Sequence, residues 1–323
     1  MESDIDIVYT WVNGADPKFQ AQLQKCLQET SASPTQASAS SQRFRDNEEL
    51  RYSLRSLEAF APWFRMVHVV TNGQVPQWLD TLHDRVSIVT HDMIFPNKSD
   101  LPTFNSTAIE LHLHKIPNLS TKFLYFNDDC FLGRATSMNA FVTTAGGQYF
   151  YFQPIPLHSN MNEGLVHDRA YAYTQTLVEK LWSRRHPRLL PAHAPQLYDR
   201  DVIARLEKMT HDEFRETSSH KFRSGNDLVL RVLYSFFILE HPEQRNVHEA
   251  KLLKDSRDYS FVALGSHSWR MRHMFWKIQT LRPRFFCIND DLGDVPADYK
   301  TLHYLRTFLR SYFPHPSSFE MSI

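Results

Sequence analysis

The sequence contains only nine glycines among its 323 residues, and this scarcity excludes several ways of binding a nucleotide. The glycines nowhere form the G-x-G-x-x-G dinucleotide fingerprint or the Gly-Lys-Ser/Thr phosphate loop. P-loop kinases and ordinary NAD dehydrogenases are therefore excluded. If the protein handles phosphates, it must use a metal ion, arginines and histidines in place of a glycine-rich loop.

Cysteine and net charge are also scarce. Cys26, Cys130 and Cys287 are too few and too far apart for a disulfide framework or a zinc site of four thiolates. They lack sequence neighbours that would activate a thiolate, and no G-x-S-x-G elbow is present, so Ser or Cys nucleophiles are not expected. The 36 basic and 36 acidic residues cancel, which argues against a nucleic-acid binder.

Long apolar runs are missing as well. No segment approaches the roughly 18 apolar residues of a membrane span. The longest candidate, residues 229–239, is interrupted by Arg231. The first residues are acidic and resemble no signal peptide. With three unpaired cysteines, these features predict a cytoplasmic protein acting near a membrane; a soluble part of a longer secretory-pathway enzyme would share them.

Candidate strands and helices alternate along the first part of the chain. Apolar strands are predicted at residues 5–10, 66–71, 86–90 and 123–126, with helices starting near Asp46 and Asn105. This order predicts an α/β fold with a mainly parallel sheet and helices on both faces, Rossmann-like or GT-A-like. Each strand is followed by Asn, Asp, Gly or His, so these polar residues should share the edge where such sheets bind ligands.

The chain divides into three predicted parts. Residues 1–150 form the α/β part, with a mobile surface loop at 29–42 that is either a tolerated insertion or a lid. Residues 151–280 form a helical subdomain, with helices predicted at 168–182, 201–209 and 226–240. Residues 281–323 contribute a strand at 284–288, expected to rejoin the first sheet, and a helix at 298–312.

Two Asn-Asp-Asp triplets, at residues 127–129 and 289–291, follow aromatic-rich strands. Adjacent carboxylates repel each other unless a cation lies between them, and hard oxygen ligands suit Mg²⁺ or Mn²⁺. We therefore predict a metal site that uses Asp128, Asp129, Asn289 and Asp290. The alternative is that each triplet is only a turn or a helix cap.

Basic residues and histidines supply the other candidate groups. Arg45 lies at a predicted helix start, where free backbone N–H groups favour anions. Arg51 could instead form an ordinary ion pair with Glu48. His193, between two prolines, and Arg223, which follows His220 and Lys221, are candidates for proton transfer and for stabilising phosphoryl charge.

Four blocks of sequence resemble the signature blocks of the Stealth family of sugar-1-phosphate transferases. The first is residues 4–14 (DIDIVYTWVNG), and the second runs from 45–57 (RDNEELRYSLRSL) through TNGQ at 71–74 to FNDD at 126–129. The third combines PAH at 191–193, SHKFR at 219–223 and ND at 226–227, and the fourth combines FCINDD at 286–291 with PSSFE at 316–320. The resemblance spans nearly the whole chain in the family's order.

This family includes bacterial capsular polysaccharide phosphotransferases and the enzyme that builds the mannose 6-phosphate mark. The resemblance implies transfer of a sugar 1-phosphate, such as GlcNAc 1-phosphate, from a UDP-sugar to a hydroxyl of a carbohydrate acceptor, with release of UMP. The large modules that the animal enzyme inserts between the second and third blocks have no counterpart here. Protein-substrate recognition of that kind is therefore not expected.

The resemblance also implies roles for individual residues. His193 would be the acid/base residue or a phosphoryl contact, Arg45 and Arg223 would hold phosphoryl oxygens, and Asp129 would belong to the catalytic centre. The residues predicted to bind the substrate are Asp6, Tyr9, Trp11, Asn13, Gly14, Arg45, Asp46, Asn47, Arg51, Asn72, His220 and Lys221. Two alternatives remain open, a metal-dependent glycosyltransferase that releases UDP and a non-catalytic nucleotide-sugar-binding module.

Overall fold

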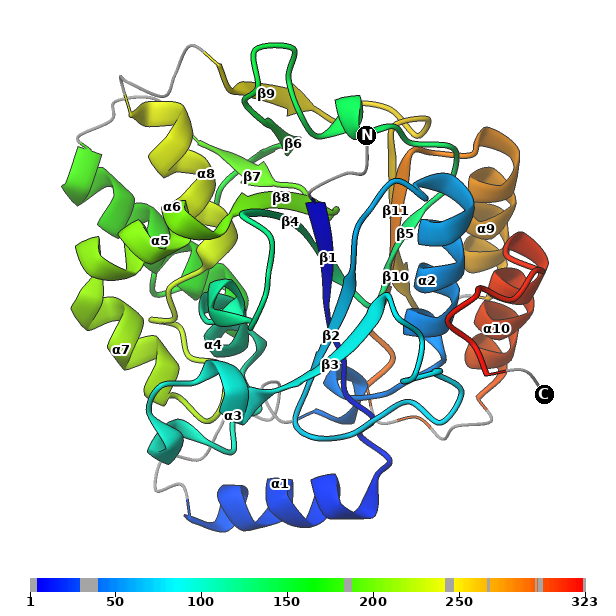
Figure 1. The fold of residues 1–323 in the computed structure, drawn as a ribbon, viewed down its shortest axis with the longest axis horizontal. Helices are drawn as coiled ribbons and strands as arrows, with labels where there is room; N and C mark the ends of the chain where they lie inside the picture. The colour runs from blue at the N-terminus through cyan, green and yellow to red at the C-terminus, as the bar shows by residue number, and fades with distance from the viewer. Residues whose placement is uncertain are drawn as a thin grey trace.

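Five strands form the central sheet of the computed structural model, in the order β3-β2-β1-β4-β8 (Figure 1). The structure describes residues 5–29, 40–182, 188–241, 247–265, 268–293, 295 and 299–321, so most of the predicted loop at 29–42 lies outside the described residues. The strands are β1 (Ile5–Thr10), β2 (Val67–Thr71), β3 (Val86–Thr90), β4 (Lys122–Asn127) and β8 (Gln196–Asp199). All pairings are parallel except that of β8 with β4, which confirms the predicted α/β class.

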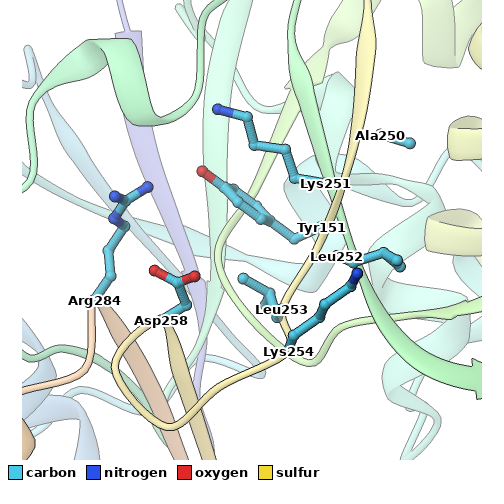
Figure 2. Close-up of a pocket in the computed structure, with 8 residues that line it drawn as sticks. All are labelled: Tyr151, Ala250, Lys251, Leu252, Leu253, Lys254, Asp258 and Arg284. Carbon is cyan, nitrogen blue, oxygen red and sulfur yellow. The ribbon is translucent and has the colours of Figure 1, made fainter.

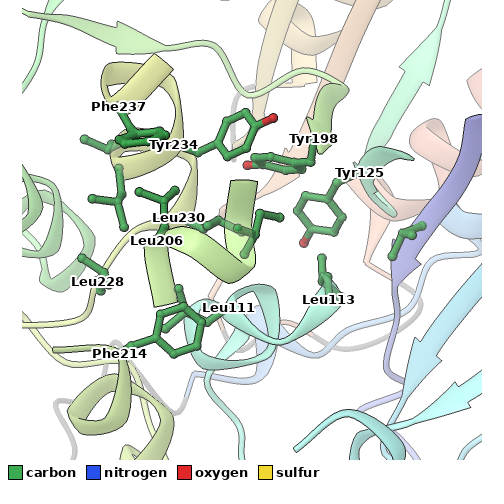
Figure 3. Close-up of a cluster of buried hydrophobic side chains, with 14 of the residues drawn as sticks. Leu111, Leu113, Tyr125, Tyr198, Leu206, Phe214, Leu228, Leu230, Tyr234 and Phe237 are labelled. Atoms are coloured by element: carbon green, nitrogen blue, oxygen red, sulfur yellow. The ribbon is translucent and has the colours of Figure 1, made fainter. Parts of the chain in front are cut away.

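Side chains of the central strands alternate between two buried faces, as the period of two in a strand requires. Val8 and Tyr125 pack into one hydrophobic cluster, whereas Tyr9 and Phe126 pack into another. The first cluster, part of which is drawn in Figure 3, fills the space between the sheet and the helices of the middle of the chain. Because hydrophobic side chains cover both faces of the sheet, polar side chains that bind a substrate or metal are expected at the strand ends.

The middle part of the chain is less helical than the sequence predicted. The expected helices are present as α5 (Val166–Trp182), α6 (Arg200–Met209) and α8 (Leu230–Glu240), with α7 (His211–Ser219) in addition. Strands β6 (Tyr149–Pro156), β7 (Leu189–Pro191) and β9 (Glu249–Leu252) form a separate sheet, in the order β7-β6-β9, and β8 joins the central one. His193 therefore lies on a loop between β7 and β8 and not within a helical subdomain.

The strand predicted at 284–288 does not rejoin the central sheet. It is β11 (Phe285–Asp290), which pairs with β10 (Tyr259–Leu264) and β5 (Cys130–Leu132) in a second sheet. β11 cannot pair with β4, because β1 and β8 already pair with the two edges of β4. The two Asn-Asp-Asp triplets therefore follow strands of two different sheets. The chain crosses from β4 into β5 at Asp128 and Asp129, and this crossing brings β11 beside the end of β4.

The helix predicted from Asp46 begins three residues later, as α2 (Glu49–Phe60). Glu48 is its N-cap residue, with a left-handed φ of 68°, and the Glu48 amide donates to Asp46 Oδ1 at 2.9 Å. Asp46 therefore stabilises the turn before the helix. Figure 1 shows α2 beside the second sheet, at the edge formed by β5, where the Leu132 amide donates to Ser56 Oγ at 3.1 Å. One face of this sheet is covered by α9 (Ser268–Leu281) and α10 (Lys300–Tyr312), close to the predicted 298–312.

The remaining elements are short or peripheral. No helix in the described part of the chain is long and apolar enough to span a bilayer. The other helices are α1 (Pro17–Glu29), α3 (His91–Ile94), α4 (Ser106–Leu111) and the 3₁₀ turns Ser41–Arg43, Lys98–Asp100, Leu113–Lys115 and Met138–Ala140.

Candidate functional site

Asp129 and His193 form the centre of the candidate site. Asp129 lies between the end of β4 and the start of β5, and its Oδ1 lies 3.3 Å from His193 Nε2. Burial disfavours the charged imidazole, but the negative charges of Cys130 and Asp129 outweigh it and raise the pKa of His193 well above its usual value. His193 in turn keeps the pKa of Asp129 below its usual value despite burial. The pair is thus an ionic contact.

Two cysteines adjoin this pair, which the sequence analysis did not anticipate. Cys287 Sγ donates to Asp129 Oδ2 at 3.2 Å, and Cys130 Sγ lies 3.7 Å from Asp129 Oδ1. Burial raises the pKa of Cys130, but the contact with Cys287 and the charge of His193 lower it to about 7. The expectation that no cysteine has an activating neighbour is therefore wrong for Cys130, because the neighbours come from β11 and the β7–β8 loop.

Asp128 faces a different set of groups from its neighbour Asp129. Burial raises its pKa well above the usual value, and the charges of Asp129, Glu49 and Asp46 raise it further. Burial and the charge of Asp46 also raise the pKa of Glu49, to about 8. These carboxyl groups form an acidic cluster at the end of β4 whose hard oxygens would suit a divalent cation. Glu49 is a member of this cluster that was not predicted from the sequence.

Arg45 binds the second triplet at Asp290. Arg45 Nη1 donates to Asp290 Oδ2 at 2.6 Å, and Arg45 Nη2 donates to the Gly293 carbonyl at 2.6 Å. Asp290 therefore already has a cationic partner. Asn289 is partly buried one residue earlier, opposite Ala263 of β10. Arg45 and Asp290, both predicted site residues, thus contact each other directly.

Arg223 lies near the same edge, on the loop between α7 and α8. Its Nη2 donates to Ser106 Oγ at 2.6 Å, at the start of α4. One helical turn later, burial raises the pKa of Glu110, and the positive charges of Arg231, Arg223 and His193 oppose that rise. Glu110 therefore interacts electrostatically with both predicted catalytic residues, His193 and Arg223. It also accepts a hydrogen bond from Tyr125 at 3.2 Å, and nothing in its sequence context had marked it.

His220 and Lys221, three and two positions before Arg223, hold the loop in place. His220 Nδ1 lies 2.7 Å from Asp227 Oδ1, and this contact raises the pKa of His220. Lys221 Nζ donates to the Ser99 carbonyl at 2.8 Å. Both residues connect the loop to neighbouring segments, which leaves Arg223 as the member of the SHKFR motif nearest the site.

The ends of β1 and β2 are connected through the first block. The Asn13 amide donates to Gln74 Oε1 at 2.9 Å, and the Asn13 carbonyl accepts from Gln74 Nε2 at 3.0 Å. The Gly14 amide donates to the Phe44 carbonyl at 2.6 Å, and a Cβ at position 14 would lie 2.5 Å from that oxygen. Asn72 Oδ1 is buried and has no hydrogen-bond partner among the described residues.

Trp11 and Asn47 line the acidic cluster from either side. Trp11 is buried, and its indole acts to lower the pKa of Asp46, which burial raises. Asn47 is fully buried, and its Nδ2 donates to Glu49 Oε1 at 2.9 Å. These residues hold the carboxyl groups in place at the edge.

Three predicted substrate-binding residues have partners inside the protein. Asp6 is at the amino end of β1, fully buried, and pairs with Arg65 at 2.6 Å. Tyr9 is fully buried in the core, with its hydroxyl 2.9 Å from Ser53 Oγ. Arg51 extends to Glu320 near the end of the chain, at 2.6 Å. In this structure these three side chains are engaged by packing, hydrogen bonding and ion pairing, and their contact with substrate stays a prediction.

An open cavity of about 560 Å³ lies elsewhere, between β9 of the β7-β6-β9 sheet and the starts of β10 and β11 (Figure 2). Its lining includes Tyr151, Lys251, Asp258 and Arg284. Asp258 and Arg284 precede β10 and β11, so the cavity adjoins the ends of these strands opposite to Asp290. None of the predicted site residues lines it.

Comparison with protein families confirms the resemblance seen in the sequence. Models of the Stealth protein conserved regions match in order, region 1 at residues 3–30, region 2 at 43–150, region 3 at 192–240 and region 4 at 277–322. Together they cover more than half of the chain. The chain belongs to the Stealth family.

Curated relatives extend the comparison over nearly the full sequence. The chain is 34% identical to an exopolysaccharide phosphotransferase of Streptomyces coelicolor, over 98% of this chain and 52% of the relative. It is 31% identical to the exopolysaccharide phosphotransferase CpsY of Mycobacterium leprae, over 98% of this chain and 57% of the relative. The chain thus spans about half the length of these relatives.

Similarity to solved structures is weaker. The galactosyltransferase LgtC in complex with donor and acceptor sugar analogues shares 12% identity, with a TM-score of 0.47 and coverage of 97% of both chains. Mouse xyloside xylosyltransferase 1 gives a TM-score of 0.38 at 11% identity, over 90% of this chain and 99% of that one. Similarity at this level is too low to support a statement about activity.

Proposed function

We propose that this protein transfers a sugar 1-phosphate from a UDP-sugar, UDP-GlcNAc in the first instance, to a hydroxyl of a carbohydrate acceptor. The observation that carries the proposal is the Asp129–His193 contact at the carboxyl edge of the central sheet. Arg223 lies near this contact: burial raises the pKa of Glu110, and the charges of Arg223 and His193 both oppose that rise. The phosphotransferase names of its relatives support the same reaction class. The cytoplasmic location stays a prediction.

In the proposed reaction, the acceptor oxygen bonds to the phosphorus next to the sugar. The bond between that phosphorus and the bridging oxygen breaks, and UMP leaves with the electron pair. His193 acts as the base in its neutral form, which its raised pKa makes the major form only at alkaline pH. It receives the hydroxyl proton through Nδ1, because Nε2 is engaged by Asp129. Asp129 fixes the ring, and Arg223 opposes the charge on the phosphoryl oxygens. No leaving-group acid is required, because UMP departs as a phosphate anion.

The acidic cluster offers hard carboxylate oxygens to a divalent cation. Asp128 offers a hard carboxylate, and the proximity of Glu49 and Asp46 raises its pKa in a way that a bound cation would reverse. We assign Asp128 as the principal ligand of Mg²⁺ or Mn²⁺, with Asp46 beside it. When bound, the cation would neutralise pyrophosphate charge. Asp290 is the weaker candidate, because Arg45 already pairs with it.

The test is identification of the nucleotide product. The protein would be incubated with UDP-GlcNAc, Mg²⁺ and an acceptor oligosaccharide, and the products separated and identified by mass spectrometry. UMP together with a phosphodiester-linked product is expected. UDP would instead establish a glycosyltransferase, and nucleotide binding without turnover would establish a binding module.

A further inference from the structure

A mixed cluster of soft and hard ligand atoms surrounds the Asp129–His193 pair. The carboxylate of Asp129, the thiols of Cys130 and Cys287 and the ring nitrogen of His193 offer one ligand atom each, all within 4.8 Å of one another. We propose that these four residues form a binding site for Zn²⁺, separate from the Mg²⁺ ligand Asp128. Since Zn²⁺ would occupy Asp129 and His193, its binding should inhibit the transfer reaction, and this second part rests on the proposed function.

The strand pairing places both thiols on the same side of the second sheet. Cys130 and Cys287 are directly paired in the antiparallel β5–β11 ladder. The flanking bonds, Ile288 N to Asp129 O at 3.0 Å and Gly133 N to Arg284 O at 3.1 Å, make the Cys130–Cys287 pair a non-hydrogen-bonded one. Directly opposed side chains lie closest at such positions. The backbone therefore sets the two sulfur atoms side by side.

The distances within the cluster suit a tetrahedral ion. Bonds of about 2.0 Å to nitrogen or oxygen and about 2.3 Å to sulfur separate neighbouring ligands by roughly 3.3 to 3.8 Å. Asp129 Oδ1 lies 3.3 Å from His193 Nε2 and 3.7 Å from Cys130 Sγ, and Asp129 Oδ2 lies 3.2 Å from Cys287 Sγ. The ligand atoms thus need only small movements to close around a zinc ion.

The loop that carries His193 is held from behind. Tyr259 OH donates to the His193 carbonyl at 3.1 Å, and Arg231 Nη1 donates to the Ala194 carbonyl at 3.0 Å and also to that of Ala192. Such support around a ligand strengthens metal binding. The side chains of His193 and Asp129 are 35% and 19% exposed, whereas both thiols are buried, so an ion can enter from the His193 side.

The ligand types select the metal. Two thiols and an imidazole favour Zn²⁺ over Mg²⁺, whose preferred ligands are oxygens. Four protein ligands leave no open position for water or substrate, which is the pattern of a structural or inhibitory site and not of a catalytic one. The oxygens of Asp128, which lie outside the four-ligand set, remain suited to the hard cation.

Direct binding can be measured without substrate. The reduced, metal-free chain would be titrated with Co²⁺, then with Zn²⁺ in competition with a chromophoric chelator. A thiolate-to-cobalt absorption band and one Zn²⁺ per chain are expected. C130S and C287S should lose the band and stoichiometric Zn²⁺ binding, whereas C26S, which removes a buried thiol of α1, should keep both. Absence of the band in the wild-type chain would overturn the site.

Two further measurements protect the test. Because C130S and C287S alter buried positions, H193Q at the partly exposed ligand provides a second variant, and circular dichroism checks that it folds. It should weaken Zn²⁺ binding, and unchanged affinity would argue against the four-ligand set. UMP release at fixed Mg²⁺ should fall as Zn²⁺ is added and recover with chelator. Full activity of the zinc-loaded chain would overturn the inhibition, whereas no UMP under any condition would overturn the proposed function together with the inhibition and leave the cobalt result standing.

Discussion

Asp129 Oδ1 and His193 Nε2 lie 3.3 Å apart although 64 positions separate the two residues in the sequence. Asp129 is placed by the end of β4, and His193 by a loop that follows β7 of a different sheet. The contact therefore depends on the assembled fold.

Removing either partner of this pair should abolish most of the transfer. H193A eliminates the proposed proton acceptor, and D129N leaves the ring without its charged partner, so each should lower kcat by roughly 10²- to 10⁴-fold. The measurement is UMP release at saturating donor, with folding checked by circular dichroism. H303A, on the exposed face of α10, is the matched control and should match wild type. Near-wild-type kcat in H193A would remove His193 from the mechanism.

Substitution of Asp128 should raise the Mg²⁺ concentration that the reaction requires. D128N removes a hard ligand, so we expect the Mg²⁺ concentration for half-maximal activity to rise by at least tenfold, and EDTA to abolish wild-type activity. D291N, at an exposed position of the second triplet, should leave the requirement unchanged. If the Mg²⁺ dependence of D128N equals that of wild type, Asp128 is not the principal metal ligand.

The sequence predicted the four parallel strands because each is a short apolar run that ends in polar residues. The common edge then follows from parallel pairing alone. The neighbours of Cys130 could not be predicted in this way. They depend on β5 turning out of the central sheet and on the register of β11, and no periodicity within either short strand specifies a pairing partner.

The partners of individual site residues could not be predicted where the fold decides which side chains are buried. Asp6, Tyr9 and Arg51 have side chains suited to ligand binding, and they lie within family blocks. In the structure, each is satisfied by a partner inside the protein: Arg65, Ser53 and Glu320 respectively. A motif indicates that a residue type is required at a position. Only the folded structure shows whether that side chain has a partner inside the protein.

Gly14 should tolerate no side chain. The Cβ of G14A would lie 2.5 Å from the Phe44 carbonyl oxygen and 2.6 Å from Phe44 Cβ, so the segments after β1 and before α2 would separate. We expect a loss of about 1 to 3 kcal/mol in unfolding free energy and a raised KM for the donor. G73A is the control for glycine removal, because no atom lies within 4 Å of its Cβ position, although its φ of +105° adds backbone strain. A raised donor KM in G73A but not in G14A would contradict the assignment.

Asp6 separates structural from functional roles. D6N removes the partner of Arg65 and His68 from a fully buried position, so we expect a loss of roughly 3 kcal/mol of stability or more. The donor KM should stay unchanged in the folded fraction, because Asp6 lies at the amino end of β1. Urea unfolding and initial-rate kinetics measure the two effects. A raised donor KM in D6N together with normal stability would indicate that Asp6 contacts the substrate.

Glu320 should make the stability of the protein depend on acid pH. Burial favours its neutral form, but hydrogen bonds from Arg55, Ser317 and Arg51 outweigh this and lower the pKa of Glu320 to about 2 from its usual 4.5. In the unfolded chain the carboxylate takes up a proton near 4.5, whereas the folded chain resists until about 2. The stabilisation is therefore complete above 4.5 and is lost as the pH falls toward 2.

The variant E320Q tests this dependence. It leaves Arg55 and Arg51 without their shared carboxylate, so at pH 7 we expect its unfolding free energy to be lower by about 3 kcal/mol. The difference from wild type should shrink as the pH is lowered from 4.5 toward 2, because the wild-type carboxylate then loses its advantage. Urea denaturation across this range measures both values, and E249Q, at an exposed position of β9, should follow wild type throughout. A difference that stays constant with pH would show that packing, and not the charge of Glu320, holds the end of the chain against α2.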